Sequence, residues 1–372
     1  MGGVLIRKAF QKTLLQVRHI TVVPPAQAHD LVATVYTDAE HDYGVLSPAL
    51  AVHSPIPDLL AAAWILTRET LIADGRVDRA TKEAVATSVS IANACQFGVD
   101  LHLTTLDAVN ERRDATGSDD AAAVAADHSV RVLSEWARSS AGAGWRTTPF
   151  AADQAPELLG TVLAAHYLNR IATLFLPRSA VPAGITAAAG PAALRLLGGH
   201  LLTAAARPHR PGASLRLLPD AALPADLAWA QGNPGIAAAL ARVAAATDAA
   251  GARAVPAPVR DLVTRELSQW DGDPTGIGPD WADARMSALD DADRPAGRLA
   301  LLVALAPHAV DLAVVEEFRR GRRADRDLVE LTAWASMAAA RRICARIAPA
   351  PVARVLPFRR RRNRNDVADA PG

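Results

Sequence analysis

Cysteine and aromatic residues are scarce in this sequence. Two cysteines, Cys95 and Cys344, occur in 372 residues, and aromatic residues make up 4% of the chain. Two cysteines cannot build a disulfide framework, and such sparse use is typical of a reducing compartment, so we expect a cytoplasmic protein. Alanine is abundant instead, for example at 121–126 and 236–250. Because alanine loses no side-chain entropy in a helix, this composition predicts an all-α fold.

The sequence also lacks a long uninterrupted apolar run and a strong net charge. The most apolar stretch, 185–206, contains Arg195 and two adjacent glycines, which argues against a membrane-spanning helix. The formal net charge of +1 provides no overall field for nucleic acid or for an anionic membrane. The basic run at 359–362 has no interleaved aromatic residues, and we interpret it as part of a disordered tail. We therefore expect neither nucleic acid nor a membrane as a partner.

Sequence motifs for cofactors are missing as well. The chain has no glycine-rich phosphate loop of the G-x-G-x-x-G or G-x-x-x-x-G-K type, and no spacing of histidine and cysteine that fits a zinc site. The sequence thus predicts no nucleotide cofactor and no metal.

Proline and glycine clusters divide the chain into segments. The first segment is predicted to form an amphipathic helix that Pro24–Pro25 ends. The predicted segments are an N-terminal helix and connector at 1–42, a helical domain at 43–177, a linker with one helix at 178–224, a second helical half at 225–350, and a basic disordered tail at 351–372.

The two helical halves resemble each other in one respect. Apolar segments at 158–171 and 329–343 both end in an arginine followed by an isoleucine, Arg170–Ile171 and Arg342–Ile343. A degenerate tandem duplication is one interpretation of this pattern. The other is that two alanine-rich helices look alike by composition alone. Since only the first half has a cluster of cysteine and histidine, the second half is predicted to contribute packing surface.

The residues that carry chemistry lie at a specific spacing in the first half. Glu83 is followed by cysteine at position 95, glycine at 98 and histidine at 102, in the segment KEAVATSVSIANACQFGVDLH. This spacing resembles the alkylhydroperoxidase D and carboxymuconolactone decarboxylase family, in which a glutamate, a Cys-x-x-Cys pair and a histidine follow one another at these intervals. The segments RETL at 68–71 and HYLNRI at 166–171 also look familial, and the resemblance covers about 43–177. Gly98 stands where the family has its second, reactive cysteine.

Helix geometry gives this spacing a meaning of its own. Positions 95, 98 and 102 follow an i, i+3, i+7 pattern, so they share one face of a helix across two turns. Each residue alone has an ordinary structural interpretation, since a buried cysteine behaves as a small hydrophobe and a glutamate near a helix start favours the dipole. Together they predict one partly buried cavity, lined by Glu83, Cys95, Gly98, His102, Phe97, Asn93 and His166.

The resemblance implies an orthogonal helical bundle of the alkylhydroperoxidase D type and a thiol-dependent peroxide reductase or related oxidoreductase. Without a cysteine at position 98, Cys95 would be a lone nucleophile, with Glu83 and His102 managing the proton whose removal makes the thiolate. A thiol reductant or a partner protein would then have to resolve the oxidised sulfur. Gly98 predicts that peroxide reduction is weak or lost.

Two alternatives stay open at this point. In the first, Glu83 and His102 are the proton shuttles of a decarboxylase-type enzyme that acts on a small carboxylated lactone or keto-acid. In the second, the chain is a non-catalytic relative that binds a small molecule or only assembles. The resemblance also implies a homo-oligomer, because members of the family commonly form trimers or hexamers.

Overall fold

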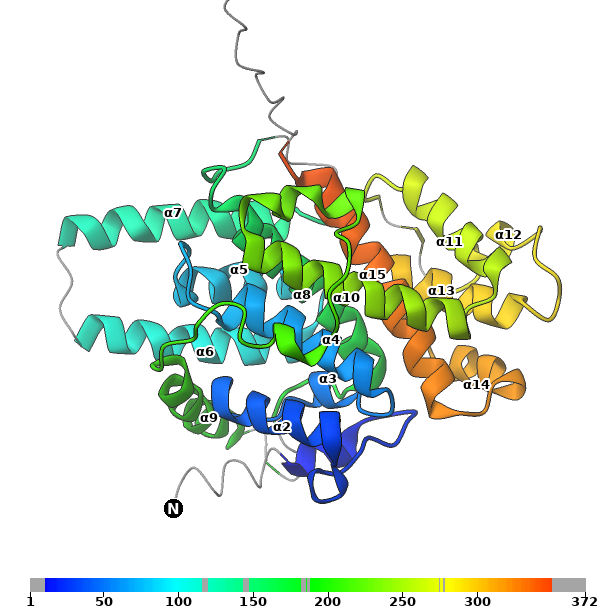
Figure 1. Ribbon diagram of the computed structural model, residues 1–372, viewed down its shortest axis with the longest axis horizontal. Coiled ribbons are helices and arrows are strands. Elements are labelled where there is room, and N and C mark those ends of the chain that lie inside the picture. The colour runs from blue at the N-terminus through cyan, green and yellow to red at the C-terminus, as the bar shows by residue number, and fades with distance from the viewer. Residues whose placement is uncertain are drawn as a thin grey trace, which may run out of the picture.

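The computed structural model describes residues 11–349 except 116–119, 143–146, 182–184, 186–187, 274 and 277, so the tail predicted at 351–372 lies outside the described residues. Every regular element in the described part is helical, which confirms the predicted all-α class (Figure 1). The first half contains α2 (Asp30–Asp42), α3 (Pro48–Ala51), α4 (Pro57–Thr67), α5 (Arg79–Ala92), α6 (Gln96–Ala115), α7 (Asp120–Arg138) and α8 (Ala155–Phe175). The remainder contains α9 (Gly190–Ala205), α10 (Pro234–Ala254), α11 (Ala257–Gln269), α12 (Trp281–Arg285), α13 (Arg294–Leu305), α14 (Leu312–Gly321) and α15 (Asp325–Ile347). Short 3₁₀ helices connect some of these, and a π-helical turn at Arg68–Ile72 continues α4.

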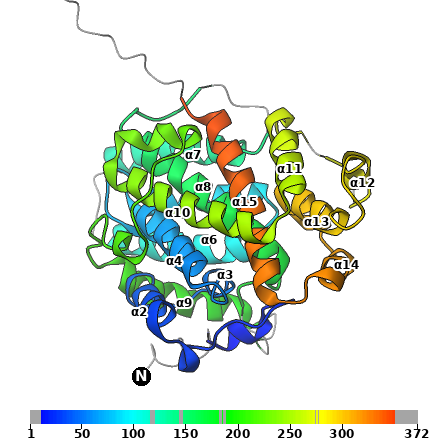
Figure 2. The same ribbon diagram turned by 45° about the vertical axis from the view of Figure 1, so that its right-hand side comes forward.

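Helix α8 lies at the centre of the molecule. Nearly all of its residues are buried, and it packs against α5 and α15, while α10 packs on both α4 and α15 (Figure 2). Helices from both halves therefore share one hydrophobic core. Helix α8 is long and apolar enough to cross a membrane, but 89% of its most apolar window is buried inside the protein. This burial is typical of the core helix of a folded domain.

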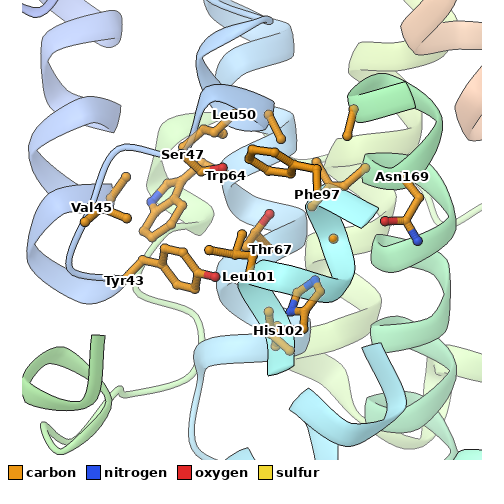
Figure 3. A pocket seen from close by; sticks show the side chains of 16 residues that line it. Tyr43, Val45, Ser47, Leu50, Trp64, Thr67, Phe97, Leu101, His102 and Asn169 are labelled. Carbon is orange, nitrogen blue, oxygen red and sulfur yellow. The ribbon is translucent and has the colours of Figure 1, made fainter. Parts of the chain in front are cut away.

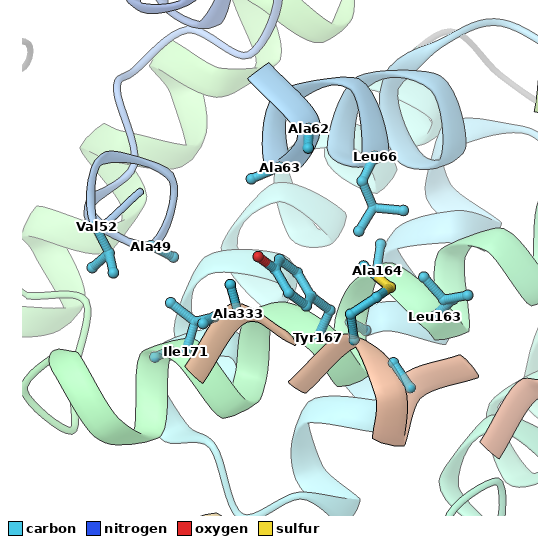
Figure 4. Close-up of a cluster of buried hydrophobic side chains, with 14 of the residues drawn as sticks. Ala49, Val52, Ala62, Ala63, Leu66, Leu163, Ala164, Tyr167, Ile171 and Ala333 are labelled. Carbon is cyan, nitrogen blue, oxygen red and sulfur yellow. The ribbon is translucent and has the colours of Figure 1, made fainter. Parts of the chain in front are cut away.

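Small side chains let large ones fill the centre of the core. Figure 4 shows Tyr167 of α8 close to Ala63 of α4 and Ala333 of α15. The Tyr167 hydroxyl lies 2.7 Å from Nε2 of His53, so its buried oxygen has a hydrogen-bond partner. Burial of a large apolar side chain contributes about 1.5–3 kcal/mol, and the hydrogen bond removes the penalty of an unpaired polar atom.

Two arginines occupy similar positions on α8 and α15, the helices that contain the two similar apolar segments. Arg170 of α8 donates from Nε to the carbonyl of Ala304 near the end of α13 (3.2 Å). Arg342 of α15 donates from Nη2 to the carbonyl of Ser268 near the end of α11 (2.8 Å). Cations are favourable there because they meet the negative end of the helix dipole. The parallel agrees with a tandem duplication, which stays a prediction.

The N-terminal segment departs from the sequence prediction. A helix was expected to run to about residue 20 and to end at Pro24–Pro25, but in the described part this first helix ends with the 3₁₀ turn Leu14–Gln16, and Val17 is already extended. The chain leaves the helix because it binds to α8: the amide of Arg18 donates to the carbonyl of Phe175 (2.7 Å), and its guanidinium donates to carbonyls in the last turn.

Two polar anchors position the helices around the cavity. Buried Glu69 accepts hydrogen bonds from the amides of Gly212 (2.6 Å) and Ser214 (3.1 Å), which holds the segment after α9 against the first half. Helix α5 begins after Asp78, and the Asp78 carboxylate accepts a hydrogen bond from the amide of Thr81 at 2.9 Å. This N-cap fixes the start of the helix that carries the site glutamate.

Candidate functional site

A small cavity lies between α2, α4, α6 and α8 (Figure 3). Its volume is about 50 Å³. Because one buried water needs about 10–15 Å³ on this measure, the cavity has room for a molecule of only a few heavy atoms. Most of the lining is apolar, for example Phe97 and Leu101 of α6. The polar side chains that line it are Tyr43, Ser47, Trp64, Thr67, His102 and Asn169.

His102 is the imidazole on this lining, and imidazole is the side chain that most often acts as a general acid or base. It lies in the second turn of α6 and is 7% exposed. Its Nδ1 donates a hydrogen bond to Oε2 of Glu83 at 2.7 Å. The described residues provide no hydrogen-bond partner for its Nε2. The ring is thus held through one nitrogen, and the other is available to a ligand.

Glu83 lies behind His102, in the second turn of α5, and its side chain is fully buried. Arg79, one turn earlier, contacts Oε1 of Glu83 through both Nε and Nη2 at 2.7 Å. Burial acts to raise the pKa of Glu83, but Arg79 and the hydrogen bond from His102 outweigh it, so the pKa is lowered. An ionised Glu83 accepts a hydrogen bond from Nδ1–H, which keeps the ring proton on Nδ1 and leaves Nε2 of the neutral ring as a base.

Cys95 does not line the cavity. It directly precedes α6 instead of lying within it, so the expected shared helix face does not extend to its sulfur. Cys95 is 3% exposed, and its thiol contacts the backbone amides of Phe97 and Gly98 and the side chain of Thr173. Burial raises its pKa despite these hydrogen bonds. Since the thiolate is the reactive form, this environment disfavours a nucleophilic role.

Gly98 does line the cavity, but the space above its Cα is occupied. A Cβ placed there would lie 2.5 Å from Oδ1 of Asn169 and 2.7 Å from Oγ of Ser90. These two atoms are 3.2 Å apart and hydrogen-bonded. The carboxamide of Asn169 therefore fills the volume that a cysteine side chain at position 98 would need.

Asn93 and His166 were predicted to line the cavity, but the structure places them in a separate network of hydrogen-bonded side chains, in which Asn93 is half-buried. The Asn93 amide nitrogen lies 3.1 Å from Nδ1 of His166, whose Nε2 lies 2.8 Å from Oγ of Ser140. Because Nδ1 accepts a hydrogen bond from the amide, the ring proton is on Nε2, which donates a hydrogen bond to the serine oxygen. That direction is opposite to the one that activates a serine nucleophile. Burial, and then Arg170, lower the pKa of His166, so the ring stays neutral.

The sequence did not identify three side chains of the site. Arg79 precedes Glu83 by one helical turn, and this i, i+4 spacing was a usable signal. Tyr43 and Trp64 come from other elements, and no local pattern links them to position 102. Among the described residues, no group of three or more His, Cys, Asp or Glu side chains is placed to hold a metal ion.

Comparison with known proteins gives two matches. The profile of the "Carboxymuconolactone decarboxylase family" matches residues 58–129, a range that includes Glu83, Gly98 and His102. The "Alkyl hydroperoxide reductase Rv2159c" of Mycobacterium tuberculosis is 36% identical over 328 residues, which cover 88% of this chain and 94% of that protein. No solved structure matches the chain significantly.

Proposed function

The chain belongs to the carboxymuconolactone decarboxylase family, and from this premise we propose that its cavity is a proton-transfer site in which His102, oriented by Glu83, acts on a small carbon acid. The observation that carries the proposal is the pairing of Nδ1 of His102 with Glu83 at 2.7 Å while the ring lines the cavity. Neither cysteine contributes to the lining. The chemistry available to a ligand in this cavity is therefore acid–base chemistry.

In the proposed reaction, Nε2 of His102 removes a proton from a carbon next to a carbonyl group. The imidazolium that forms is stabilised by the adjacent ionised carboxylate of Glu83, and the proton then returns to the substrate from the same nitrogen. No atom is oxidised or reduced. A positioned acid–base group of this kind typically contributes about 10²–10⁴-fold to a rate.

Isotope exchange in D₂O tests this proposal without knowledge of the natural substrate. The protein is incubated with cyclopentanone, γ-butyrolactone or 2-oxobutyrate, and proton NMR follows the loss of the C–H signals next to the carbonyl. We expect exchange above the buffer rate for at least one compound, its loss in His102→Phe, and its retention in Cys95→Ser. Exchange at the buffer rate for all three compounds, or equal rates in the wild type and His102→Phe, would contradict the proposal.

A second candidate, thiol-dependent peroxide reduction, is favoured by the name of the Mycobacterium tuberculosis relative. The amide contacts at the Cys95 sulfur, at the start of α6, also favour a thiolate. The test is consumption of cumene hydroperoxide with dithiothreitol as the reductant. Activity that is lost in Cys95→Ser and kept in Cys344→Ser would support this candidate. Cys344 is a matched control because it is also buried and burial also raises its pKa. We expect the wild type to match both variants.

A further inference from the structure

The three tyrosines of the chain differ in what their hydroxyl groups bind. The hydroxyl of Tyr36 donates to the carbonyl of Val23 (2.9 Å), and that of Tyr167 lies 2.7 Å from Nε2 of His53. The buried hydroxyl of Tyr43 has no such partner among the described residues. A buried hydroxyl without a partner is unfavourable, so a ligand that supplies an acceptor would satisfy it.

Tyr43 directly follows α2 and lines the same cavity as His102. Thr105 lies beside the Tyr43 hydroxyl, but its own hydroxyl donates to the carbonyl of Leu101 (2.9 Å). Because Thr105 follows His102 by three residues on α6, the two occupy neighbouring positions on one face of that helix. Figure 3 shows the Tyr43 hydroxyl on the side of the ring that faces Leu101 and His102. The hydroxyl and the proposed base therefore share one side of the cavity.

The other polar groups of the lining are bonded already or are directed elsewhere. The hydroxyl of Thr67 donates to a carbonyl one turn earlier in α4 (2.8 Å). Figure 3 shows Ser47 and Trp64 across the cavity from His102. The same view shows the amide nitrogen of Asn169 turned away. Among the polar groups of this lining, the tyrosine hydroxyl is thus the donor that a ligand can meet beside the imidazole.

The surroundings of Tyr43 keep its hydroxyl protonated. Burial, and then the negative charge of Glu83, raise the pKa of Tyr43, and Arg79 and Thr105 oppose this only in part. The guanidinium of Arg79 lies over the ring, 5.7 Å from its centroid, and binds Glu83. A neutral phenol donates a hydrogen bond and does not remove a proton. Tyr43 therefore does not compete with His102 as the base.

We infer that Tyr43 is a second catalytic residue of the proposed proton-transfer site, whose hydroxyl donates a hydrogen bond to the carbonyl oxygen of the substrate. This inference rests on the proposed function. When Nε2 of His102 removes the proton, the electron pair of the C–H bond forms the C=C bond of an enolate, and the carbonyl π pair moves onto the oxygen. The phenol keeps its proton and stabilises the charge that develops there. Because this charge is absent from the bound ketone, the hydrogen bond is stronger in the transition state and raises the rate.

Tyr43→Phe tests this inference, and Tyr36→Phe is the matched control. Both side chains are buried and lie in or directly after α2, but Tyr36 does not line the cavity. Exchange in D₂O is measured against the concentration of the carbon acid that exchanges fastest. We expect kcat to fall by about 10²–10³-fold in Tyr43→Phe, with a much smaller change in KM, since the donor acts mainly on the enolate. Tyr36→Phe should lower the free energy of unfolding and leave both constants unchanged.

Infrared spectroscopy detects the same hydrogen bond without turnover. Acetone labelled with carbon-13 at the carbonyl is added to the wild type and to each variant, and the carbonyl band that saturates belongs to the bound molecule. In Tyr43→Phe the bound carbonyl loses its donor, so we expect its band at a higher frequency than in the wild type. The band in Tyr36→Phe should match that of the wild type.

The outcomes separate this inference from the proposed function. Exchange that is lost in His102→Phe but normal in Tyr43→Phe would support the proposed function and overturn the inference. A wild type without exchange, but with a carbonyl band that moves in Tyr43→Phe, would refute the proposed function and support the hydrogen bond assigned to Tyr43. The inference would also be overturned by equal bands in the wild type and Tyr43→Phe, by the lack of a saturable band in the wild type, or by equal losses of exchange in Tyr43→Phe and Tyr36→Phe.

Discussion

Helices α5 and α13 both begin with an arginine that follows an aspartate, but they bury different kinds of side chain. Helix α5 buries Lys82 and Glu83, at 1% and 0% exposure, whereas the buried face of α13 is apolar and includes Leu299. Arg298 of α13 is partly exposed and pairs with Asp283. A buried charge is unfavourable unless it is paired, so the charges on α5 need a partner network, and for Glu83 that network ends at the cavity. The comparison indicates that the first half holds the chemistry and the second half supplies packing.

Replacing the proposed base should have the largest effect. We expect His102→Phe to lower the exchange rate about 10²–10⁴-fold, the usual contribution of a general base. His308 in the second half is exposed, and His308→Phe should leave the rate unchanged. The measurement is isotope exchange in D₂O on the best of the three carbon acids. A similar loss in both variants would remove the distinction between the two halves.

Glu83→Gln should have the next largest effect. The amide keeps the shape of the carboxylate but no longer stabilises the imidazolium, so we expect the exchange rate to fall by about 10–100-fold, as when the carboxylate partner of a functional histidine is removed. Glu330 of α15 offers a matched control, because it too is buried and pairs with Arg253 at 2.7 Å. Glu330→Gln should lower the free energy of unfolding while exchange by the folded protein stays normal. Equal exchange rates for the wild type and Glu83→Gln would contradict the proposed role of this carboxylate.

Gly98→Cys tests whether the family site can be rebuilt. The added Cβ would meet Asn169 and Ser90 at 2.5 and 2.7 Å, so we expect the free energy of unfolding to fall by about 1–3 kcal/mol. Peroxide turnover with dithiothreitol should not appear, since Cys95 does not line the cavity and burial raises the pKa of its thiol. Gly199→Cys on α9 is the control, because nothing lies within 4 Å of its Cβ position. Urea unfolding in the presence of a reductant measures the stability of both variants. A stable and peroxide-active Gly98→Cys variant would show that the pocket still accepts a thiol.

The smallest predicted effect concerns pH. The folded-state pKa of Glu83 is lowered, because Arg79 and His102 outweigh burial. Such a group contributes stability that is fully present above its ordinary pKa of 4.5 and is lost as the pH falls through the folded value. Urea unfolding between about pH 6 and about pH 3 should therefore show a steeper loss in the wild type than in Glu83→Gln. Leu299→Ala should lower stability at every pH, by about 2–5 kcal/mol, without changing this slope. Equal slopes in the wild type and Glu83→Gln would refute the lowered pKa.

The sequence predicted the helical class and much of the site because both depend on local patterns. Alanine-rich helices are a local feature, and the interval between Glu83 and His102 belongs to two adjacent helices. The placement of Cys95 was wrong because one residue in a left-handed conformation, Ala94, at φ of 50°, ends the turn after α5 and leaves the cysteine before α6 instead of on its face.

Contacts between distant segments were beyond sequence reasoning. Asn169 reaches Gly98 from a helix some seventy residues later, and Trp64 and Tyr43 join the cavity from two further elements. No periodicity encodes such contacts, because they depend on how the helices cross. Cytoplasmic location and homo-oligomeric assembly stay predictions, which cell fractionation and analytical ultracentrifugation would measure.

The protonation state of His102 tests the central claim most directly. Nitrogen-15 NMR of the labelled protein at pH 7 distinguishes the two ring nitrogens, and the signals that disappear in His102→Phe identify this residue. Because Nδ1 donates to Glu83 at 2.7 Å, we predict a proton on Nδ1 and none on Nε2 in the neutral ring. On lowering the pH, Nε2 should take up the proton. A neutral ring with its proton on Nε2 would contradict the account, because that nitrogen could not then act as the base in the cavity.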